Sequence, residues 1–276
     1  MKSGPAKVSP IKGRVLIVAG SDSGGGAGIQ ADIKTVSALN AYAMTAIAAL
    51  TAQNTTGVHG VVPVDPAFVA LQMKVVLEDI GADAIKIGML ANAAVIEAVV
   101  GEYEQRAVNV PLVVDPVMVA KSGHFLLEPD AVLTLRKRML PLAEVVTPNL
   151  PEAEALTDIP VRTLDDMRRA AEMIRTFGPK AVLLKGGHLE DEQLSDLLLT
   201  DDGEEVFESR RVHTPHTHGT GCTLSSAIAA GIAQGMSVRD AVVRARSYVE
   251  MAILTAPGLG HGHGPLNHLH TVKPFP

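Results

Sequence analysis

Short apolar runs alternate along the chain with longer segments in which apolar residues recur at helical spacing. Pro66 to Asp79 and Leu164 to Phe177 show this helical spacing. The apolar runs, which we predict to be strands, are Val15 to Ala19, Ala46 to Ala52, Ala84 to Ile87, Leu112 to Asp115, Val145 to Thr147 and Ala181 to Lys185. Alternation of this kind is typical of repeated βαβ units and predicts an α/β fold with a buried, mostly parallel sheet.

One segment departs from this rhythm. Leu194 to Thr200 and Glu204 to Arg210 are joined by Asp201-Asp202-Gly203. An Asp-Gly turn between two such runs is typical of a β-hairpin. We therefore expect antiparallel strands at one edge of the sheet.

The length of 276 residues favours one large domain, because single cores stop growing at roughly 250 to 300 residues. We expect a flexible N-terminal segment over 1–13, a single domain over 14–270 and a C-terminal tail over 271–276. No internal repeat or linker interrupts this domain.

Composition narrows the functional classes. The chain is 47% hydrophobic, which excludes a disordered or collagen-like protein. Its net charge of −6 offers no basic field for a nucleic acid, and no apolar stretch is long enough for a membrane span. The start of the chain lacks the apolar core of a signal peptide, so we expect a cytoplasmic protein without nucleic-acid or membrane partners.

Ligands of open α/β sheets bind at the carboxyl ends of the strands, and the first such exit is rich in glycine. Ala19 to Gly28 lets the backbone approach a ligand closely and leads into a helix. The segment formally matches a dinucleotide fingerprint, but no acidic residue occurs between Asp32 and Asp65 to bind a ribose. No Gly-Lys dipeptide occurs either, which excludes a Walker A loop. A purely structural turn stays open as the alternative.

Three further exits carry polar groups. Asp115 ends an apolar strand, where a carboxylate is costly unless it is paired, hydrated or bound to a cation. Asn149 and Glu152 stand where a strand turns into a helix, and helix capping alone would also explain them. Lys185 precedes two glycines at the last exit.

The most informative segment is His216 to Ser225. Its glycines precede a predicted helix, so the backbone N–H groups of Gly219, Thr220, Gly221 and Cys222 should converge at a positive helix end suited to phosphate. The same dipole should lower the pKa of the Cys222 thiol, which makes it a candidate base or nucleophile. A buried, inert cysteine is the alternative. As the only cysteine, it excludes an internal disulfide and a C-x-x-C metal site.

The histidines raise a separate metal hypothesis. His216 with His218, or His261 with His263, form H-x-H pairs. No acidic or thiolate ligand recurs at metal-site spacing, so most of these histidines are expected to be loop residues.

Taken in order, these motifs resemble one family, the hydroxymethylpyrimidine/phosphomethylpyrimidine kinases of thiamine synthesis within the ribokinase-like group. The resemblance covers roughly 14–268. It rests on Ala19-Gly-Ser-Asp22, Gly26-Ala-Gly-Ile-Gln-Ala-Asp32, Leu50-Thr-Ala-Gln-Asn54, Lys86-Ile-Gly-Met-Leu90, Val114-Asp-Pro-Val-Met-Val-Ala-Lys-Ser-Gly123, Thr147-Pro-Asn149, Leu184-Lys-Gly-Gly-His188 and His218-Gly-Thr-Gly-Cys222.

The resemblance implies a three-layer α/β/α fold and two ATP-dependent steps. The first phosphorylates the hydroxymethyl group of 4-amino-5-hydroxymethyl-2-methylpyrimidine, and the second converts the monophosphate to the diphosphate. It also implies a homodimer. The positions that match the family's pyrimidine site are Gly20, Asp32, Gln53, Met89 and Val117.

The remaining implied roles concern phosphate transfer. Asp115 and Glu152 match carboxylates that organise Mg²⁺, which prefers oxygen ligands and retains several waters. Positions near the ATP phosphates are Asn149, Lys185 and Thr217. The anion hole corresponds to Gly219, Thr220, Gly221 and Cys222, with Cys222 as the candidate base where sugar kinases carry an aspartate.

Three rival functions are considered. A pyridoxal kinase or dual-specificity enzyme is the nearest, but such relatives tend to carry a second cysteine where Ala120 stands here. A catalytically silent ligand-binding protein is opposed by the intact Gly219 to Cys222 segment. An NAD-dependent dehydrogenase lacks its ribose-binding acid.

Overall fold

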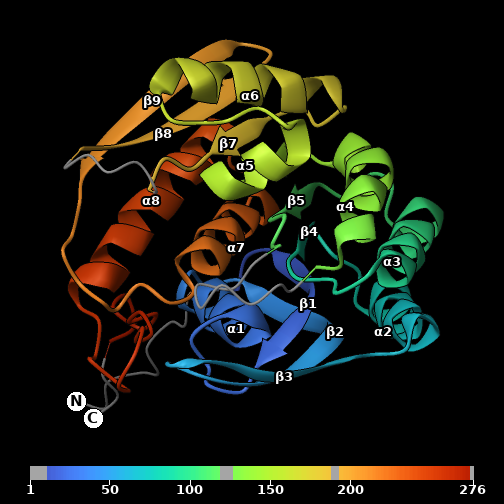
Figure 1. Ribbon diagram of the computed structural model, residues 1–276. Helices are drawn as coiled ribbons and strands as arrows, with labels where there is room; N and C mark the ends of the chain where they lie inside the picture. The colour runs from blue at the N-terminus through green and yellow to red at the C-terminus, as the bar shows by residue number, and fades with distance from the viewer. Residues whose placement is uncertain (1–10, 119–126, 188–192, 274–276) are drawn as a thin grey trace, which may run out of the picture.

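The computed structural model describes residues 11–118, 127–187 and 193–273, and within them the strands form one sheet (Figure 1). The strand order is β3-β2-β1-β4-β5-β6-β7-β8-β9. Neighbours from β2 to β7 pair in parallel, whereas β3, β8 and β9 run antiparallel to their neighbours. The bounds are β1 (Arg14–Asp22), β2 (Tyr42–Asn54), β3 (Gly57–Pro63), β4 (Ala84–Ile87), β5 (Leu112–Val114), β6 (Val145–Val146), β7 (Val182–Leu184), β8 (Gln193–Thr200) and β9 (Gly203–Arg210).

The six predicted strands and the β8–β9 hairpin are confirmed, but the expectation of antiparallel pairing at only one edge was incomplete. β2 continues to Asn54 and turns back into β3 at the opposite edge. Asn54 closes this turn, because its Oδ1 accepts the N–H groups of Thr56 and Gly57 at 2.9 and 3.2 Å. No residue of β3 is buried, so its sequence lacks the apolar alternation that would have revealed a strand.

The helices begin where side chains cap their first N–H groups. Asp65 accepts the N–H groups of Ala67 and Phe68, and Thr163 forms a capping box with Asp166. The helices predicted over Pro66 to Asp79 and Leu164 to Phe177 are confirmed. The bounds are α1 (Gly28–Ala38), α2 (Pro66–Asp79), α3 (Ala93–Arg106), α4 (Pro129–Thr134), the π-helical turn η1 (Leu135–Met139), the 3₁₀ turn η2 (Leu140–Leu142), α5 (Leu150–Thr157), α6 (Leu164–Thr176), α7 (Thr220–Ala233) and α8 (Val238–Leu254).

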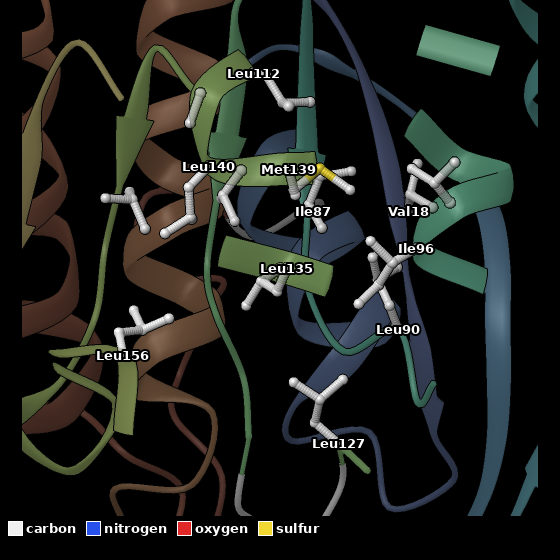
Figure 2. Close-up of a cluster of buried hydrophobic side chains, with 14 of the residues drawn as sticks. Val18, Ile87, Leu90, Ile96, Leu112, Leu127, Leu135, Met139, Leu140 and Leu156 are labelled. Atoms are coloured by element: carbon white, nitrogen blue, oxygen red, sulfur yellow. The ribbon is translucent and has the colours of Figure 1, made fainter. Parts of the chain in front are cut away.

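Helices cover both faces of the sheet and enclose two apolar cores. Alternate residues of β1 divide between them: Leu16 and Val18 pack into the core under α2 to α6, and Val15 and Ile17 into the core under α1, α7 and α8. Figure 2 shows Val18 and other strand residues of the first core meeting side chains from α3 and η1. The predicted three-layer α/β/α fold is confirmed.

This topology gathers the functional segments. The carboxyl ends of the parallel strands all lie on the same side of the sheet, where α5 and α7 begin. Among the described residues, no helix is long and apolar enough to cross a membrane.

Candidate active site

A cleft of about 1460 Å³ opens at the carboxyl ends of the parallel strands. It also runs along β8, β9 and α8, where the sequence predicted no site residue. Apart from Asp32, every predicted site residue lines this cleft: Gly20, Gln53, Met89, Asp115, Val117, Asn149, Glu152, Lys185, Thr217, Gly219, Thr220, Gly221 and Cys222.

Asp115 and Lys185 form an ion pair in the cleft, with side chains 3% and 14% exposed. Lys185 Nζ donates to Asp115 Oδ1 at 3.0 Å, and Thr147 donates to the same oxygen at 3.1 Å. Ser225 on α7 lies 3.4 Å from Asp115 Oδ2. The carboxylate predicted to need a partner therefore has one, and the pair joins the ends of two strands to α7.

Glu152 caps α5 and also faces this ion pair. Its Oε2 accepts the N–H of Asn149 at 2.8 Å, and Asn149 Oδ1 accepts the N–H of Glu152 at 2.9 Å. Burial and the nearby carboxylate of Asp115 raise the pKa of Glu152 to about 7, although the charge of Lys185 opposes them. The capping alternative is thus correct for both residues. A second carboxylate still stands beside Asp115, where a cation would relieve its burial.

The start of α7 depends on two glycines, Gly219 before the helix and Gly221 in its first turn. Gly219 adopts a left-handed conformation with φ of 82°, and a Cβ there would collide with the carbonyl oxygen of Gly26. A Cβ on Gly221 would stand 3.3 Å from Lys185 Nζ. The first turn of α7, with N–H groups that have no acceptor within their own helix, therefore lies directly over the Asp115–Lys185 pair.

The expectation of a lowered thiol pKa was wrong for Cys222. Burial, together with the carboxylates of Asp32 and Asp115, raises its pKa to about 12 despite the opposing charge of Lys86. The residue lies in the first turn of α7, but desolvation is the largest influence on its thiol and outweighs the charge of Lys86. With this pKa, Cys222 is a neutral thiol at physiological pH.

Asp32, the exception among the predicted site residues, is sealed beneath the cleft. Its side chain is 0% exposed, and both carboxylate oxygens accept from Lys86 Nζ, at 3.0 and 2.9 Å. Ser226 donates to the same carboxylate at 2.6 Å. Lys86 lines the cleft, whereas Asp32, which matches the family's pyrimidine site, does not line it and can reach a ligand only through Lys86. The missed signal was a single cation within the buried strand Ala84–Ile87.

The Gly-rich segment proves to be organised by Asp22. Its carboxylate accepts the N–H groups of Gly24, Gly26 and Ala27 at 2.8 to 3.0 Å. These N–H groups are therefore already bonded, and the loop does not offer them to a phosphate. Burial raises the pKa of Asp22, but hydrogen bonds from His218 and the backbone outweigh it and hold this pKa below its usual value.

The structure does not support the hypothesis of a histidine metal site. The described parts of the chain contain no group of three or more His, Cys, Asp or Glu side chains arranged to hold a metal ion. His218 instead bonds Asp22, its Nε2 lying 2.9 Å from Asp22 Oδ2.

The domain has three α/β/α layers, and its Gly219 to Cys222 segment, which we call the anion loop, starts a helix over a lysine–carboxylate pair at the strand ends. This combination defines a phosphotransferase of the ribokinase-like class. Comparison with known proteins then identifies the family. The model of the phosphomethylpyrimidine kinase family matches residues 22–267, and the chain belongs to this family.

Individual proteins similar to this chain support the same family. The hydroxymethylpyrimidine/phosphomethylpyrimidine kinase of Escherichia coli is 50% identical over 92% of this chain and 97% of its own. A bifunctional thiamine biosynthesis protein of Geobacter sulfurreducens is 50% identical over 94% of this chain, which spans 52% of that protein. Among solved structures, pyridoxal kinase from Bacillus subtilis in complex with ADP superposes with a TM-score of 0.85 at 37% identity, over 93% of this chain and 97% of that one.

Proposed function

We propose that the chain transfers the γ-phosphoryl group of ATP to the hydroxymethyl group of 4-amino-5-hydroxymethyl-2-methylpyrimidine, and then phosphorylates the resulting monophosphate. The observation that carries this proposal is the placement of the α7 anion loop directly over the Asp115–Lys185 pair in the same cleft as Gln53 and Met89. Membership of the phosphomethylpyrimidine kinase family gives the acceptor.

The pyrimidine half of the cleft combines an amide with apolar cover. Gln53 can pair with the edge of an aminopyrimidine, while Met89 and Val117 pack against its faces. Gly20 leaves room for Met89, because a Cβ there would stand 2.9 Å from the methionine Cε. Asp32 supports this half through Lys86.

The phosphate half is assigned to the remaining predicted residues. Lys185, Asn149 and Thr217 line the cleft and are assigned to the ATP phosphates, and the ADP complex of the Bacillus subtilis pyridoxal kinase supports a nucleotide as ligand. Asp115 and Glu152 supply the carboxylates that would hold a Mg²⁺ ion directly or through water, since this ion prefers oxygen ligands and retains several waters. Such an ion would neutralise charge that develops on the transferred phosphoryl group.

The anion loop and the cations carry most of this chemistry. In a loose transition state the acceptor proton leaves late, so positioning and charge neutralisation matter more than a strong base. Gly219, Thr220 and Gly221 surround the developing charge, with Lys185 on its other side. Cys222 is a neutral thiol and cannot accept this proton, which can pass to an oxygen of the transferred phosphoryl group; Cys222 is assigned to contact with the acceptor hydroxyl.

Pyridoxal kinase activity is the second candidate, because a pyridoxal kinase superposes so closely. Ala120, on which the distinction depends at sequence level, lies outside the described residues, as does His188. Measuring kcat/KM for the pyrimidine and for pyridoxal with one preparation separates the two functions. We expect the pyrimidine to be preferred by at least roughly tenfold, and the reverse preference would reassign the chain.

We also propose a homodimer in the cytoplasm. Large apolar side chains are exposed on the paired residues Leu50 of β2 and Val62 of β3, and on α2 at Phe68, Leu71 and Val75. Exposed apolar side chains of this kind favour a protein partner. Light scattering at several protein concentrations measures the oligomeric state, and a monomer at all of them would contradict the proposal.

A further inference from the structure

His218 stands between the Gly-rich loop and the amide of Gln53. Its Nε2 lies 2.9 Å from Asp22 Oδ2 and 3.3 Å from Gln53 Nε2. The ring also packs against Gly26, where even a Cβ would displace it. Asp22 and His218 are only 3% and 14% exposed, so water competes little for these contacts.

Proton counting assigns the donor in the first contact. The Asp22 carboxylate already accepts three backbone N–H groups, and an ionised carboxylate can only accept. His218 Nε2 must therefore carry the proton that lies between them. A protonated Nε2 has no lone pair, so it cannot accept from the amide nitrogen of Gln53.

The other neighbour of the amide leads to the same assignment. The Thr51 hydroxyl has a single proton and two oxygens within reach, the carbonyl oxygen of Ser21 at 2.9 Å and Gln53 Oε1 at 3.1 Å. When the proton goes to the nearer oxygen, that of Ser21, Oγ1 can only accept from the amide. Both neighbours are satisfied once the amide is turned about its last bond, with oxygen toward His218 and nitrogen toward Thr51.

We propose that Asp22, acting through His218, sets the orientation of the Gln53 amide and so decides which end of it donates to the pyrimidine and which accepts. An aminopyrimidine edge presents an amino donor beside a ring-nitrogen acceptor, so an inverted amide would face donor with donor. Asp22 and His218 are then positioning residues for the acceptor substrate. The inference rests on the proposed function, which supplies the pyrimidine.

A double-mutant cycle tests whether His218 acts through Gln53. His218→Met removes the Nε2 proton, and we expect the KM for the pyrimidine to rise roughly tenfold with the KM for ATP unchanged. His218→Gln retains an N–H group at similar reach and should restore the KM to within about threefold. In a Gln53→Ala background, His218→Met should add no further increase, because the amide it orients is gone.

A second variant keeps every hydrogen-bonding group. Gly26→Ala pushes the ring aside and should raise the pyrimidine KM in the same direction, whereas Gly101→Ala on α3 has open space around its new Cβ and serves as the matched control. Additive effects in the cycle, or an unchanged pyrimidine KM in both His218→Met and Gly26→Ala, would overturn the inference alone. A wild-type chain that neither binds nor phosphorylates the pyrimidine would overturn the proposed function, and this inference with it.

Discussion

Lys86→Met should destabilise the chain more than any surface charge deletion. The substitution leaves Asp32 without its cation in a position where both side chains are 0% exposed and the two N–O distances are 2.9 and 3.0 Å. Removing one member of such a pair costs about 3 to 5 kcal/mol in free energy of unfolding, because the other charge stays buried. Guanidinium unfolding followed by circular dichroism measures this loss.

Two controls separate the buried charge from lost packing. Combining Lys86→Met with Asp32→Leu removes both charges and should recover most of the stability, because an apolar pair of similar volume replaces the ion pair. Arg138→Met breaks pairs with Glu97 and Glu104 in which the side chains are 41% to 50% exposed, and should cost far less than Lys86→Met.

The pH dependence of the single variant gives an independent check. Burial raises the pKa of Asp32 above its usual value even with Lys86 present, and removing Lys86 raises it further. A carboxyl group with a raised folded-state pKa favours folding below its unfolded pKa and loses that contribution as pH rises through the folded value. The deficit of Lys86→Met relative to wild type should therefore shrink from pH 7 toward pH 4. A loss below about 1 kcal/mol at pH 7, or a deficit that grows on acidification, would refute the reasoning.

Four further predictions follow from the cleft. Gln53→Ala should raise the pyrimidine KM by roughly 5- to 100-fold with an unchanged KM for ATP, since a lost buried hydrogen bond costs about 1 to 3 kcal/mol. A pyrimidine KM equal to that of the wild type would reject the role of Gln53. Asp115→Asn and Glu152→Gln should each increase the Mg²⁺ concentration needed for half-maximal rate, and wild-type titrations for both would contradict the assignment. Iodoacetamide labelling of Cys222 should be slow at pH 7 and rise about tenfold per pH unit to pH 9, because the thiol has a pKa of about 12; a plateau near pH 8 would contradict this. Gly219→Ala should lower kcat at least roughly 100-fold because its φ is positive and Gly26 blocks a side chain, and near-normal turnover would show that the loop tolerates movement.

The sequence predicts those parts of the fold that depend on one-dimensional patterns. Strands with continuous apolar runs, such as Ala84 to Ile87, are visible because both of their faces are buried. β3 was missed because its residues lie at an exposed edge and do not alternate. An Asn54 turn at the end of a long apolar strand is the local signal that could have suggested it.

Contacts between distant residues explain what was missed in the site. The burial of Asp32 and its pairing with Lys86 join positions 54 residues apart, and the tie from Asp22 to His218 spans 196. The prediction of a lowered thiol pKa for Cys222 failed for the same reason. A helix start and its dipole can be inferred from the local sequence, but the desolvation caused by surrounding elements cannot. The motif resemblance nonetheless named all the other site residues, and these residues line one cleft in the structure.

Following the pyrimidine itself tests the proposed reaction most directly. The chain is incubated with ATP, Mg²⁺ and 4-amino-5-hydroxymethyl-2-methylpyrimidine, and the pyrimidine species are separated by chromatography over time and identified by mass. We expect the monophosphate to appear first and the diphosphate to follow from it, with one ADP formed at each step. Absence of any phosphorylated pyrimidine while pyridoxal is turned over under the same conditions would contradict the assignment.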